Sequence, residues 1–270
     1  MRIIAIAGLK GGFAKTTTVI NLAAALKAQG KNSLLIDADP QCNLTQLLGI
    51  LGETEKNLFT ELKKEMEGSG GDLEQALLKQ NGIHLIPAAP ELATAELELV
   101  SVYGREQLLT WMLKPLENKY DYLFIDCPPS TGMLTVNALM ASRFVLIPLQ
   151  AEYLPMKGAF GFLKHLEQIE KLKKKMEQPI ELLGLILNRY DDRKNMNRQI
   201  AKQLEEFFGN KLFETHIRTN IQLAKAQEAG MDVFSFDKNS NGAEDYRALS
   251  REFLKKLKQM DDTYLMPVNK

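Results

Sequence analysis

The chain has 270 residues, of which 45% are hydrophobic, so it can bury a full core, and one large α/β domain is expected rather than two small ones. Lysine and arginine together number 34, as do aspartate and glutamate, and this balance excludes an overall positive field that would attract nucleic acid. Two cysteines are too few for a disulfide framework, and no apolar run approaches the roughly 18 residues of a membrane span. Because Met1-Arg2 leads directly into a predicted strand and not into a signal peptide, we expect a cytoplasmic protein.

The first predicted elements are a strand, a loop and a helix. Residues 3–6 form a short apolar run typical of a buried parallel strand, and an apolar pattern of helical period begins near Thr16. Gly11 and Gly12 allow the intervening loop to turn tightly and to bring its backbone N–H groups close to a ligand. The helix N-terminus adds its positive dipole end, Lys15 adds a charge, and the Thr16 hydroxyl can bind Mg²⁺. We therefore expect a phosphate-binding loop; a strand–turn–helix with an incidental lysine is the alternative.

A further lysine, Lys10, stands immediately before the paired glycines. The run Lys-Gly-Gly-x-x-Lys-Thr-Thr, with Ala14 where a glycine is usual, resembles the deviant Walker A motif of the ParA/MinD group of P-loop ATPases. In that family the extra lysine reaches the phosphates of the partner subunit, across a dimer that encloses two nucleotides. The resemblance implies catalytic roles for Lys10 and Lys15, ATP and Mg²⁺ as ligands, and an ATP-bound homodimer. The nucleotide contacts that it implies are Lys10, Gly11, Gly12, Phe13, Ala14, Lys15, Thr16 and Thr17.

The second predicted strand, 33–36, ends in Asp37-Ala38-Asp39-Pro40-Gln41. Carboxylates at the carboxyl end of a parallel strand lie where open α/β sheets bind ligands. Asp39-Pro40 as the start of a simple turn is the alternative. The pattern D-x-D-P-Q resembles the second motif of the partition ATPases, which implies that Asp39 orients or deprotonates the attacking water and that Asp37 lies near the Mg²⁺ shell.

The middle of the chain contains a second carboxylate motif. Residues 53–80 have a charged, helical pattern that glycines interrupt, 83–87 predict a strand, and 91–116 predict a helix. Residues 122–126 then give four apolar residues ending in Asp126, which is the Walker B pattern that delivers a carboxylate to Mg²⁺. The following Asp-Cys-Pro-Pro-Ser resembles the family's D-x-P-P-S. Together these motifs predict a metal site made by Thr16, Asp37 and Asp126.

The rest of the chain completes the predicted fold. The remaining elements are strands at 144–148, 182–187 and 212–217 and helices at 157–176, 194–208 and 221–229. By resemblance, Asn188 reads the adenine edge, and Gly-Ala-Glu-Asp-Tyr at 242–246 opens the last helix. We expect an open, mostly parallel, twisted sheet of seven or eight strands with helices on both faces, in one domain at 1–258 with a tail at 259–270.

Partition ATPases of this group bind DNA without sequence preference when ATP-dimerised, through basic residues late in the chain. The DNA contacts expected on this resemblance are Arg189, Arg193, Lys194, Arg198, Lys202 and Arg218. A solvated helix face balanced by nearby acidic residues is the alternative. The segment 217–223 departs from the family pattern, because Thr219 and Gln222 stand where arginines are usual.

The function favoured by these motifs is that of a DNA-segregation ATPase of the Soj-like ParA kind. It would have weak intrinsic ATP hydrolysis, associate with the nucleoid, and be stimulated by a ParB-like or other cargo adaptor. A MinD-like ATPase of the membrane surface is the alternative, but its amphipathic stripe would coincide with the family's ordinary last helix, so membrane binding is not expected. A metabolic P-loop enzyme is a third possibility, against which Lys10 argues because a one-subunit site has no use for it.

Overall fold

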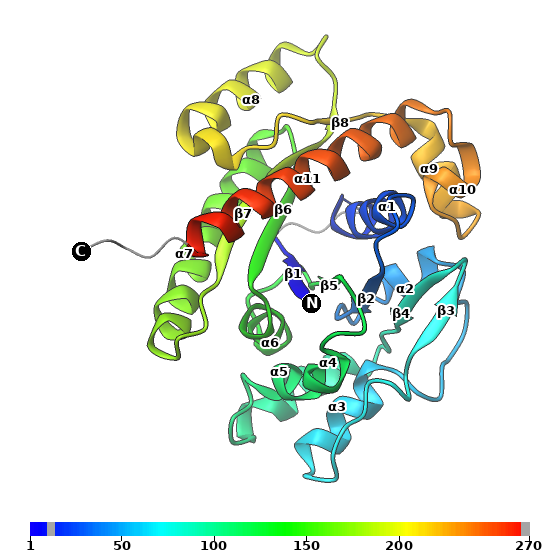
Figure 1. The fold of residues 1–270 in the computed structure, drawn as a ribbon, viewed down its shortest axis with the longest axis vertical. Helices are drawn as coiled ribbons and strands as arrows, with labels where there is room; N and C mark the ends of the chain where they lie inside the picture. Colours follow the sequence, from blue (N-terminus) through cyan, green and yellow to red (C-terminus); the bar gives the residue numbers. More distant parts are fainter. Residues whose placement is uncertain (10–13, 266–270) are drawn as a thin grey trace.

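The computed structural model describes residues 1–9 and 14–265, and its strands form one eight-stranded sheet in the order β3-β4-β2-β5-β1-β6-β7-β8 (Figure 1). The β3–β4 pair is antiparallel and the other pairs are parallel, which confirms the predicted fold class. The strands are β1 (Arg2–Ile6), β2 (Ser33–Asp37), β3 (Leu78–Gln80), β4 (Ile83–Ile86), β5 (Tyr122–Asp126), β6 (Phe144–Gln150), β7 (Glu181–Tyr190) and β8 (Ile217–Arg218).

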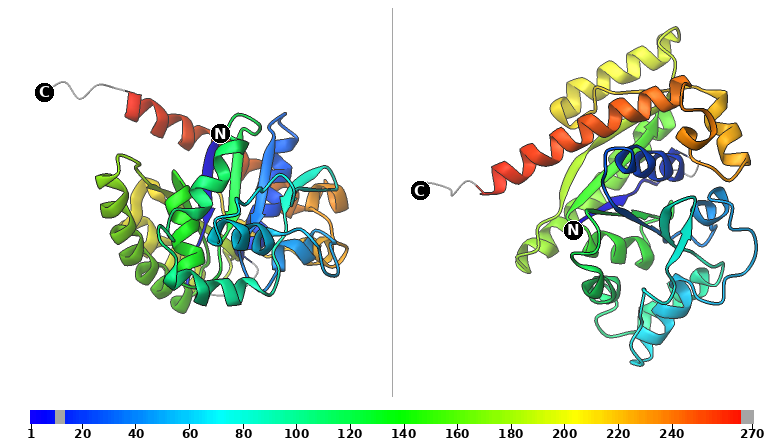
Figure 2. Two further views of the ribbon diagram at one scale, coloured as in Figure 1. Left: turned by 90° about the horizontal axis from the view of Figure 1, so that it is seen from below. Right: turned by 45° about the vertical axis from the view of Figure 1, so that its right-hand side comes forward.

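Helices cover both faces of this sheet (Figures 1 and 2). They are α1 (Ala14–Lys27), α2 (Asn43–Leu47), α3 (Leu58–Met66), α4 (Leu92–Glu98), α5 (Leu108–Leu113), α6 (Met133–Ala141), α7 (Tyr153–Lys175), α8 (Asn195–Phe208), α9 (Ile221–Glu228), α10 (Val233–Asp237) and α11 (Asn241–Leu265). Short 3₁₀ turns occupy Leu99–Ser101, Lys114–Leu116 and Gly209–Lys211. No helix in the described part of the chain has the length and apolar character to cross a bilayer.

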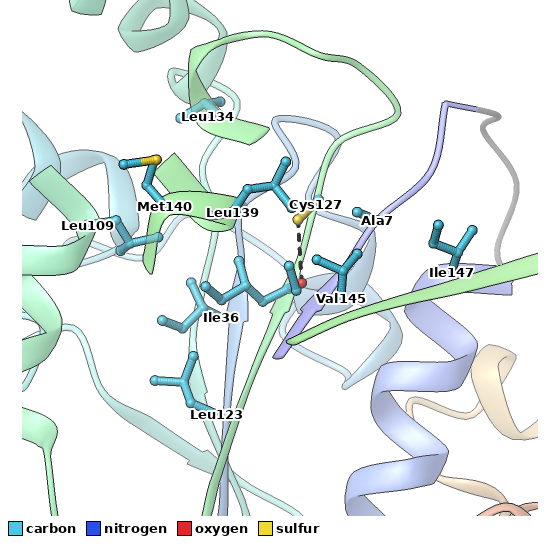
Figure 3. Close-up of a cluster of buried hydrophobic side chains, with 14 of the residues drawn as sticks. Ala7, Ile36, Leu109, Leu123, Cys127, Leu134, Leu139, Met140, Val145 and Ile147 are labelled. Atoms are coloured by element: carbon cyan, nitrogen blue, oxygen red, sulfur yellow. Dashed lines mark hydrogen bonds between the residues drawn. The ribbon is translucent and has the colours of Figure 1, made fainter. Parts of the chain in front are cut away.

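The core is divided by the sheet into two apolar layers, because successive residues of a strand point to opposite faces. On one face, Ala5, Ile125 and Val145 pack against α4–α7. Figure 3 shows part of this layer, in which Leu123 and Val145 of the strands and Leu139 of α6 belong to one cluster of buried side chains. On the other face, strand residues such as Ile6 and Phe124 pack against α1 and α11, which lie side by side (Figure 2). Burial on both faces explains the nearly continuous apolar runs of the central strands.

Three predicted elements differ in the structure. The expected helix 91–116 is broken at Val102–Glu106, where Gly104 has a φ of +67° that a helix cannot contain. Within 53–80, only α3 is an α-helix, and residues 78–80 form the edge strand β3. The expected strand 212–217 shrinks to Ile217–Arg218, with one isolated bridge from Leu212 to Leu185. In addition, α11 continues through 259–265, so this part of the predicted tail is helical.

Lys173 of α7 is a buried lysine, only 3% exposed, that closes the C-terminal end of α6. Its Nζ donates hydrogen bonds to the carbonyl oxygens of Leu139, Met140 and Ser142, at 3.2, 2.6 and 2.5 Å. The Leu139 carbonyl also accepts a 3.2 Å hydrogen bond from the N–H of Ser142, whereas the last carbonyls of a helix generally lack intrahelical partners and need such a donor. One side chain therefore fastens α7 to the end of α6.

We expect Lys173→Ala to lower the free energy of unfolding by about 2–4 kcal/mol, since it leaves buried carbonyls without donors and removes a packed aliphatic stem. The measurement is urea denaturation of both proteins. Lys174→Ala, at the next and exposed position of the same helix turn, is the matched control and should change stability by less than about 0.5 kcal/mol. Equal effects of the two substitutions would contradict the capping role.

Candidate active site

The candidate site lies at the carboxyl ends of the central strands. Here β1 leads into α1, and the register of the sheet places Asp37, the last residue of β2, beside Asp126, the last residue of β5. The N-terminus of α1 lies at the same edge, and the positive end of a helix dipole favours an anion there. The predicted contacts Lys10, Gly11, Gly12 and Phe13 lie outside the described residues. Lys15 is buried, with its Nζ 3.4 Å from the carbonyl oxygen of Gly8.

The structure joins two of the three predicted metal ligands directly. The Thr16 hydroxyl donates a hydrogen bond of 2.7 Å to Oδ2 of Asp126. The other carboxylate oxygen of Asp126, Oδ1, is fully buried and has no hydrogen-bond partner among residues 1–9 and 14–265. A buried acceptor without a donor is costly. Asp126 therefore has one oxygen held in place and one open oxygen, in the sense that none of the described residues donates a hydrogen bond to it.

Asp37 is held by the segment that follows it. Its Oδ2 accepts hydrogen bonds from the backbone N–H and the hydroxyl of Thr45, at 2.9 and 2.7 Å. Its Oδ1 accepts a longer bond, 3.2 Å, from the N–H of Asp39. Asp39 is 8% exposed, and its Oδ1 accepts a 3.0 Å bond from the N–H of Gln41. The predicted second motif is thus a hydrogen-bonded turn that fixes both carboxylates at the strand end.

Burial dominates the electrostatics of the carboxylate pair. It raises the pKa of Asp37 from 3.8 to about 7, although the bonds from Thr45 oppose the rise. Burial, with the neighbouring Asp37 charge, raises the pKa of Asp126 to about 8, while the bond from Thr16 and the Lys15 charge oppose it. Two adjacent buried carboxyl groups cannot both be ionised cheaply without a cation.

The side-chain oxygens of Thr16, Asp37 and Asp126 fit the binding of Mg²⁺ together with a phosphate. Hydroxyl and carboxylate oxygens are the ligands that Mg²⁺ prefers, and the ion is usually bound by one or two carboxylates, water and substrate phosphates. Within the described ranges, no group of three or more histidine, cysteine, aspartate or glutamate side chains could hold a metal alone. The open oxygen of Asp126 and the incomplete ligand set both favour a cation that arrives with a phosphate ligand.

A pocket of about 290 Å³ opens beside the start of α1. Its lining includes Ala14 and Thr17 of α1, the buried side chain of Asn188 at the end of β7, and the segment 217–221. Gln227 of α9 closes it by donating a hydrogen bond from Nε2 to the Thr17 hydroxyl. The pocket lies at the first turn of α1 and its lining includes the predicted Asn188, so its position suits the base of a bound nucleotide.

Arg218 is bound within the molecule. Its Nε lies 2.9 Å and its Nη2 2.6 Å from Oδ1 of Asp245, and Nη2 lies 2.7 Å from Oε2 of Glu244. The hydrogen bonds from both carboxylates raise the pKa of Arg218 further above its usual range. The Gly-Ala-Glu-Asp-Tyr motif thus ties the start of α11 to β8, and the Arg218 charge is neutralised.

The other predicted basic residues lie on and before α8. The exposed Arg189, at the end of β7, has a φ of +53°, and Lys194 directly precedes α8. The Arg193 guanidinium forms a bidentate pair with Asp191, at 2.9 and 3.0 Å, and lowers the pKa of that carboxyl to about 2. Arg198 donates to the carbonyl oxygen of Asp192 and to Oδ1 of Asn195, and Lys202 is 3.9 Å from Glu206. These basic side chains are exposed, and three of them, Arg193, Arg198 and Lys202, contact polar or acidic groups of the same segment.

Two contacts near the site escaped the sequence motifs. The Glu96 carboxylate of α4 accepts hydrogen bonds from the N–H groups of Met133 and Leu134 and so caps α6. This cap anchors the segment that leads from Asp126 into α6. The contact of Gln227 with Thr17 was also not predicted. In each contact the two residues are far apart in the sequence, so no local sequence pattern predicts it.

Comparisons with known proteins identify the relatives of this chain. Residues 1–180 match a family model described as an AAA domain. The chain is 38% identical to the sporulation initiation inhibitor protein Soj of Bacillus subtilis over 93% of this chain and 97% of that protein. It is 37% identical to the chromosome partitioning protein ParA of Myxococcus xanthus, over 94% and 88%. Among solved structures, a cobyrinic acid a,c-diamide synthase from Mycobacterium smegmatis with bound ATP analog and magnesium is similar, with a TM-score of 0.78, 32% identity and 96% of both chains covered.

The raised pKa values predict how ligand-free stability depends on pH. The unfolded carboxyl groups are ionised above about pH 5. The folded state holds protons on Asp37 or Asp126 up to about pH 7–8, so stability should fall as the pH rises from 5 to 8. Asp126→Asn removes one of these buried charges. We therefore expect it to weaken this pH dependence and to raise the Tm at pH 8 by roughly 2–4 °C or more, corresponding to at least about 1 kcal/mol.

Thermal unfolding of parent and variant without nucleotide or metal, at several pH values, provides the measurement. Asp192→Asn, at an exposed position, is the matched control and should follow the parent. A variant that is less stable than the parent at pH 8 would show that the Asp126 charge is already compensated within the protein.

Proposed function

The chain belongs to the ParA/Soj family of P-loop ATPases, and on that premise we propose that it is an ATP-dependent DNA-segregation ATPase. One observation carries the proposal: Thr16, Asp37 and Asp126 converge at the strand ends beside α1, with an open oxygen on Asp126. The names of the two relatives support partition as the use of this site. In this proposal ATP and Mg²⁺ switch the protein to a DNA-bound dimer, and a ParB-like or other cargo adaptor stimulates hydrolysis and release.

Each residue of the site has a proposed role. The backbone of the loop 10–14, the Lys15 charge and the α1 N-terminus bind the phosphates. Mg²⁺ neutralises phosphate charge when bound and would be held by the Thr16 hydroxyl with Asp37 and Asp126. Asn188 contacts the adenine in the 290 Å³ pocket beside Thr17. Lys10 reaches the phosphates of the second subunit, which makes the dimer depend on ATP.

The proposed water-positioning group is Asp39. It follows Asp37 by two residues and is 8% exposed, and its Oδ1 is oriented by the N–H of Gln41. Asp37 and Asp126 are the metal ligands in this account, so Asp39 is the remaining carboxylate of the motif. An oriented carboxylate can hold the attacking water in line with the leaving oxygen.

The proposed DNA surface is the exposed start of α8 together with the end of β7. Arg189, Arg193, Lys194, Arg198 and Lys202 all lie there. Arg218, which the sequence also suggested, is left out because two carboxylates, those of Asp245 and Glu244, pair with it and its side chain is only 45% exposed. Arg193 is kept because it has one acidic partner, Asp191, and its side chain is 86% exposed. A monomer offers only a weak patch, whereas two patches in one ATP-bound dimer bind together with a higher effective concentration. The protein would then associate with the nucleoid in the cytoplasm only in its ATP form.

We expect Asp39→Ala to reduce ATP hydrolysis by about 100-fold or more while ATP-dependent dimerisation persists, because the water loses its positioning group and the phosphate site is intact. Phosphate release and light scattering are measured on the same samples. Asp39→Asn is the sharper variant, since it keeps an acceptor for the N–H of Gln41 but removes the charge. Normal turnover in Asp39→Asn would show that Asp39 only shapes the turn.

A second variant separates ATP-dependent dimerisation from ATP hydrolysis. Lys10→Ala should bind ATP yet remain monomeric, because the subunit-bridging charge is removed. If Lys10→Ala dimerises with ATP as the parent does, the cross-subunit role is wrong.

Co-sedimentation with DNA and with liposomes, each with and without ATP, tests the function itself. We expect ATP-dependent DNA binding that is independent of sequence and weakens steeply with salt. Arg189→Ala with Lys194→Ala should reduce the salt slope by about one for each DNA phosphate that is no longer neutralised, without changing ATP affinity. Lys171→Ala, an exposed lysine of α7, is the control. ATP-dependent binding to liposomes in place of DNA would favour the membrane-surface alternative, and binding to neither would contradict the proposal.

A further inference from the structure

A second polar pocket lies at the opposite, amino-terminal edge of the sheet. It measures about 310 Å³ and is formed by the end of α1, the start of β2, the β3–β4 hairpin and Tyr120. Its lining residues are Ala23, Lys27, Lys31, Asn32, Ser33, Lys79, Gly82, Ile83, His84 and Tyr120. The volume is at the lower end of the usual range for small-molecule sites.

The lining is strongly basic. Lys27, Lys31 and Lys79 line the pocket, and none of its lining residues is an aspartate or glutamate. Within residues 1–9 and 14–265, none of these three lysines forms an ion pair. Lys27 donates one hydrogen bond of 3.2 Å from Nζ to the carbonyl oxygen of Asn81. Three ammonium groups around one cavity repel one another, and an anion between them would relieve that repulsion.

Neutral hydrogen-bonding groups complete the lining. Nδ1 of His84 lies 2.9 Å from the Tyr120 hydroxyl, and the two rings meet edge to face. Burial, followed by the charges of Lys79 and Lys27, lowers the pKa of His84, so a positive field reaches this ring. The Ser33 hydroxyl is buried and has no partner in the described part of the chain.

Two acidic residues, Asp121 and Glu74, lie near the pocket without lining it. The Asp121 carboxylate accepts a 2.8 Å hydrogen bond from the N–H of Asn32, and Glu74 pairs with Lys119. Both lie outside the set of residues that line the pocket. The lining itself therefore carries three lysine charges and no carboxylate, together with the imidazole of His84 and the phenol of Tyr120.

We propose that this pocket binds a phosphate-bearing small molecule, with Lys27, Lys31 and Lys79 around its phosphoryl group. Lysine binds phosphate as a point charge, and three lysines from the end of α1, the loop that follows it and β3 can surround one phosphoryl group. The proposal does not depend on the partition function, because the pocket shares no residue with the base pocket or with Thr16, Asp37 and Asp126. It lies at the C-terminal end of α1, whose other end begins the nucleotide site.

The test uses pyrophosphate and inorganic phosphate as probes, on protein whose nucleotide site is saturated with Mg-ADP at constant free Mg²⁺. Calorimetry compares the parent with Lys31→Gln/Lys79→Gln, and backbone amide NMR locates the bound probe. We expect saturable binding, amide shifts at Ser33 and at 82–84, and at least a tenfold loss of affinity in the double variant. Lys164→Gln, an exposed lysine of α7, is the control and should bind as the parent does.

Three outcomes would overturn the proposal. They are no binding once Mg-ADP is present, equal binding by the double variant, and amide shifts confined to the nucleotide site. A DNA arm separates the possible sources of phosphate. If the double variant loses DNA affinity in parallel with pyrophosphate affinity, the lysines contact a nucleic-acid backbone and the small-molecule assignment is wrong.

Discussion

Two buried carboxyl groups on neighbouring strands are the constraint on which the rest of this structure depends. Asp37 and Asp126 end adjacent strands of the sheet, are fully enclosed, and have pKa values raised by that burial. Protein donors hold three of their four oxygens: Thr45 and the N–H of Asp39 on Asp37, and Thr16 on Asp126. The fourth, Oδ1 of Asp126, has none among the described residues. The protein thus keeps an unfavourable arrangement that a cation with a phosphate ligand would relieve.

The surrounding elements connect this arrangement to surfaces that a partner or a second copy can reach. Glu96 anchors the start of α6 just after Asp126, and Gln227 joins α9 to α1 at the base pocket. Arg218 ties β8 to the first turn of α11 through Asp245 and Glu244. These are single side-chain contacts between elements far apart in sequence. Through them α4 is joined to the helix that follows Asp126, and α9 to the helix that carries Thr16 and Thr17.

The sequence predicted the fold and the strand-end carboxylates well because both depend on local patterns. The apolar runs that end in Asp37 and Asp126 predict two buried strands and also place a carboxylate at the end of each. The β3–β4 hairpin was missed, although Asn81-Gly82, with φ values of +51° and +72°, is a typical hairpin turn, because the charged residues before it favoured a helix. Glu96, Gln227 and the pairing of Arg218 could not be predicted, since tertiary packing alone brings their partners together. For the same reason, counting basic residues overstated the free charge near α8.

The Asp37–Asp126 pair, with its two raised pKa values, is expected to hold a proton that a Mg²⁺–phosphate ligand replaces. Calorimetric titration of Mg-ATP at pH 7.5, in buffers of different ionisation enthalpy, measures the protons exchanged on binding. With pKa values of about 7 and 8 in the ligand-free state, binding should release protons from the parent, and Asp126→Asn should release fewer. Tight binding with no dependence on the buffer, in parent and variant alike, would show that the pair is already ionised and would contradict this account.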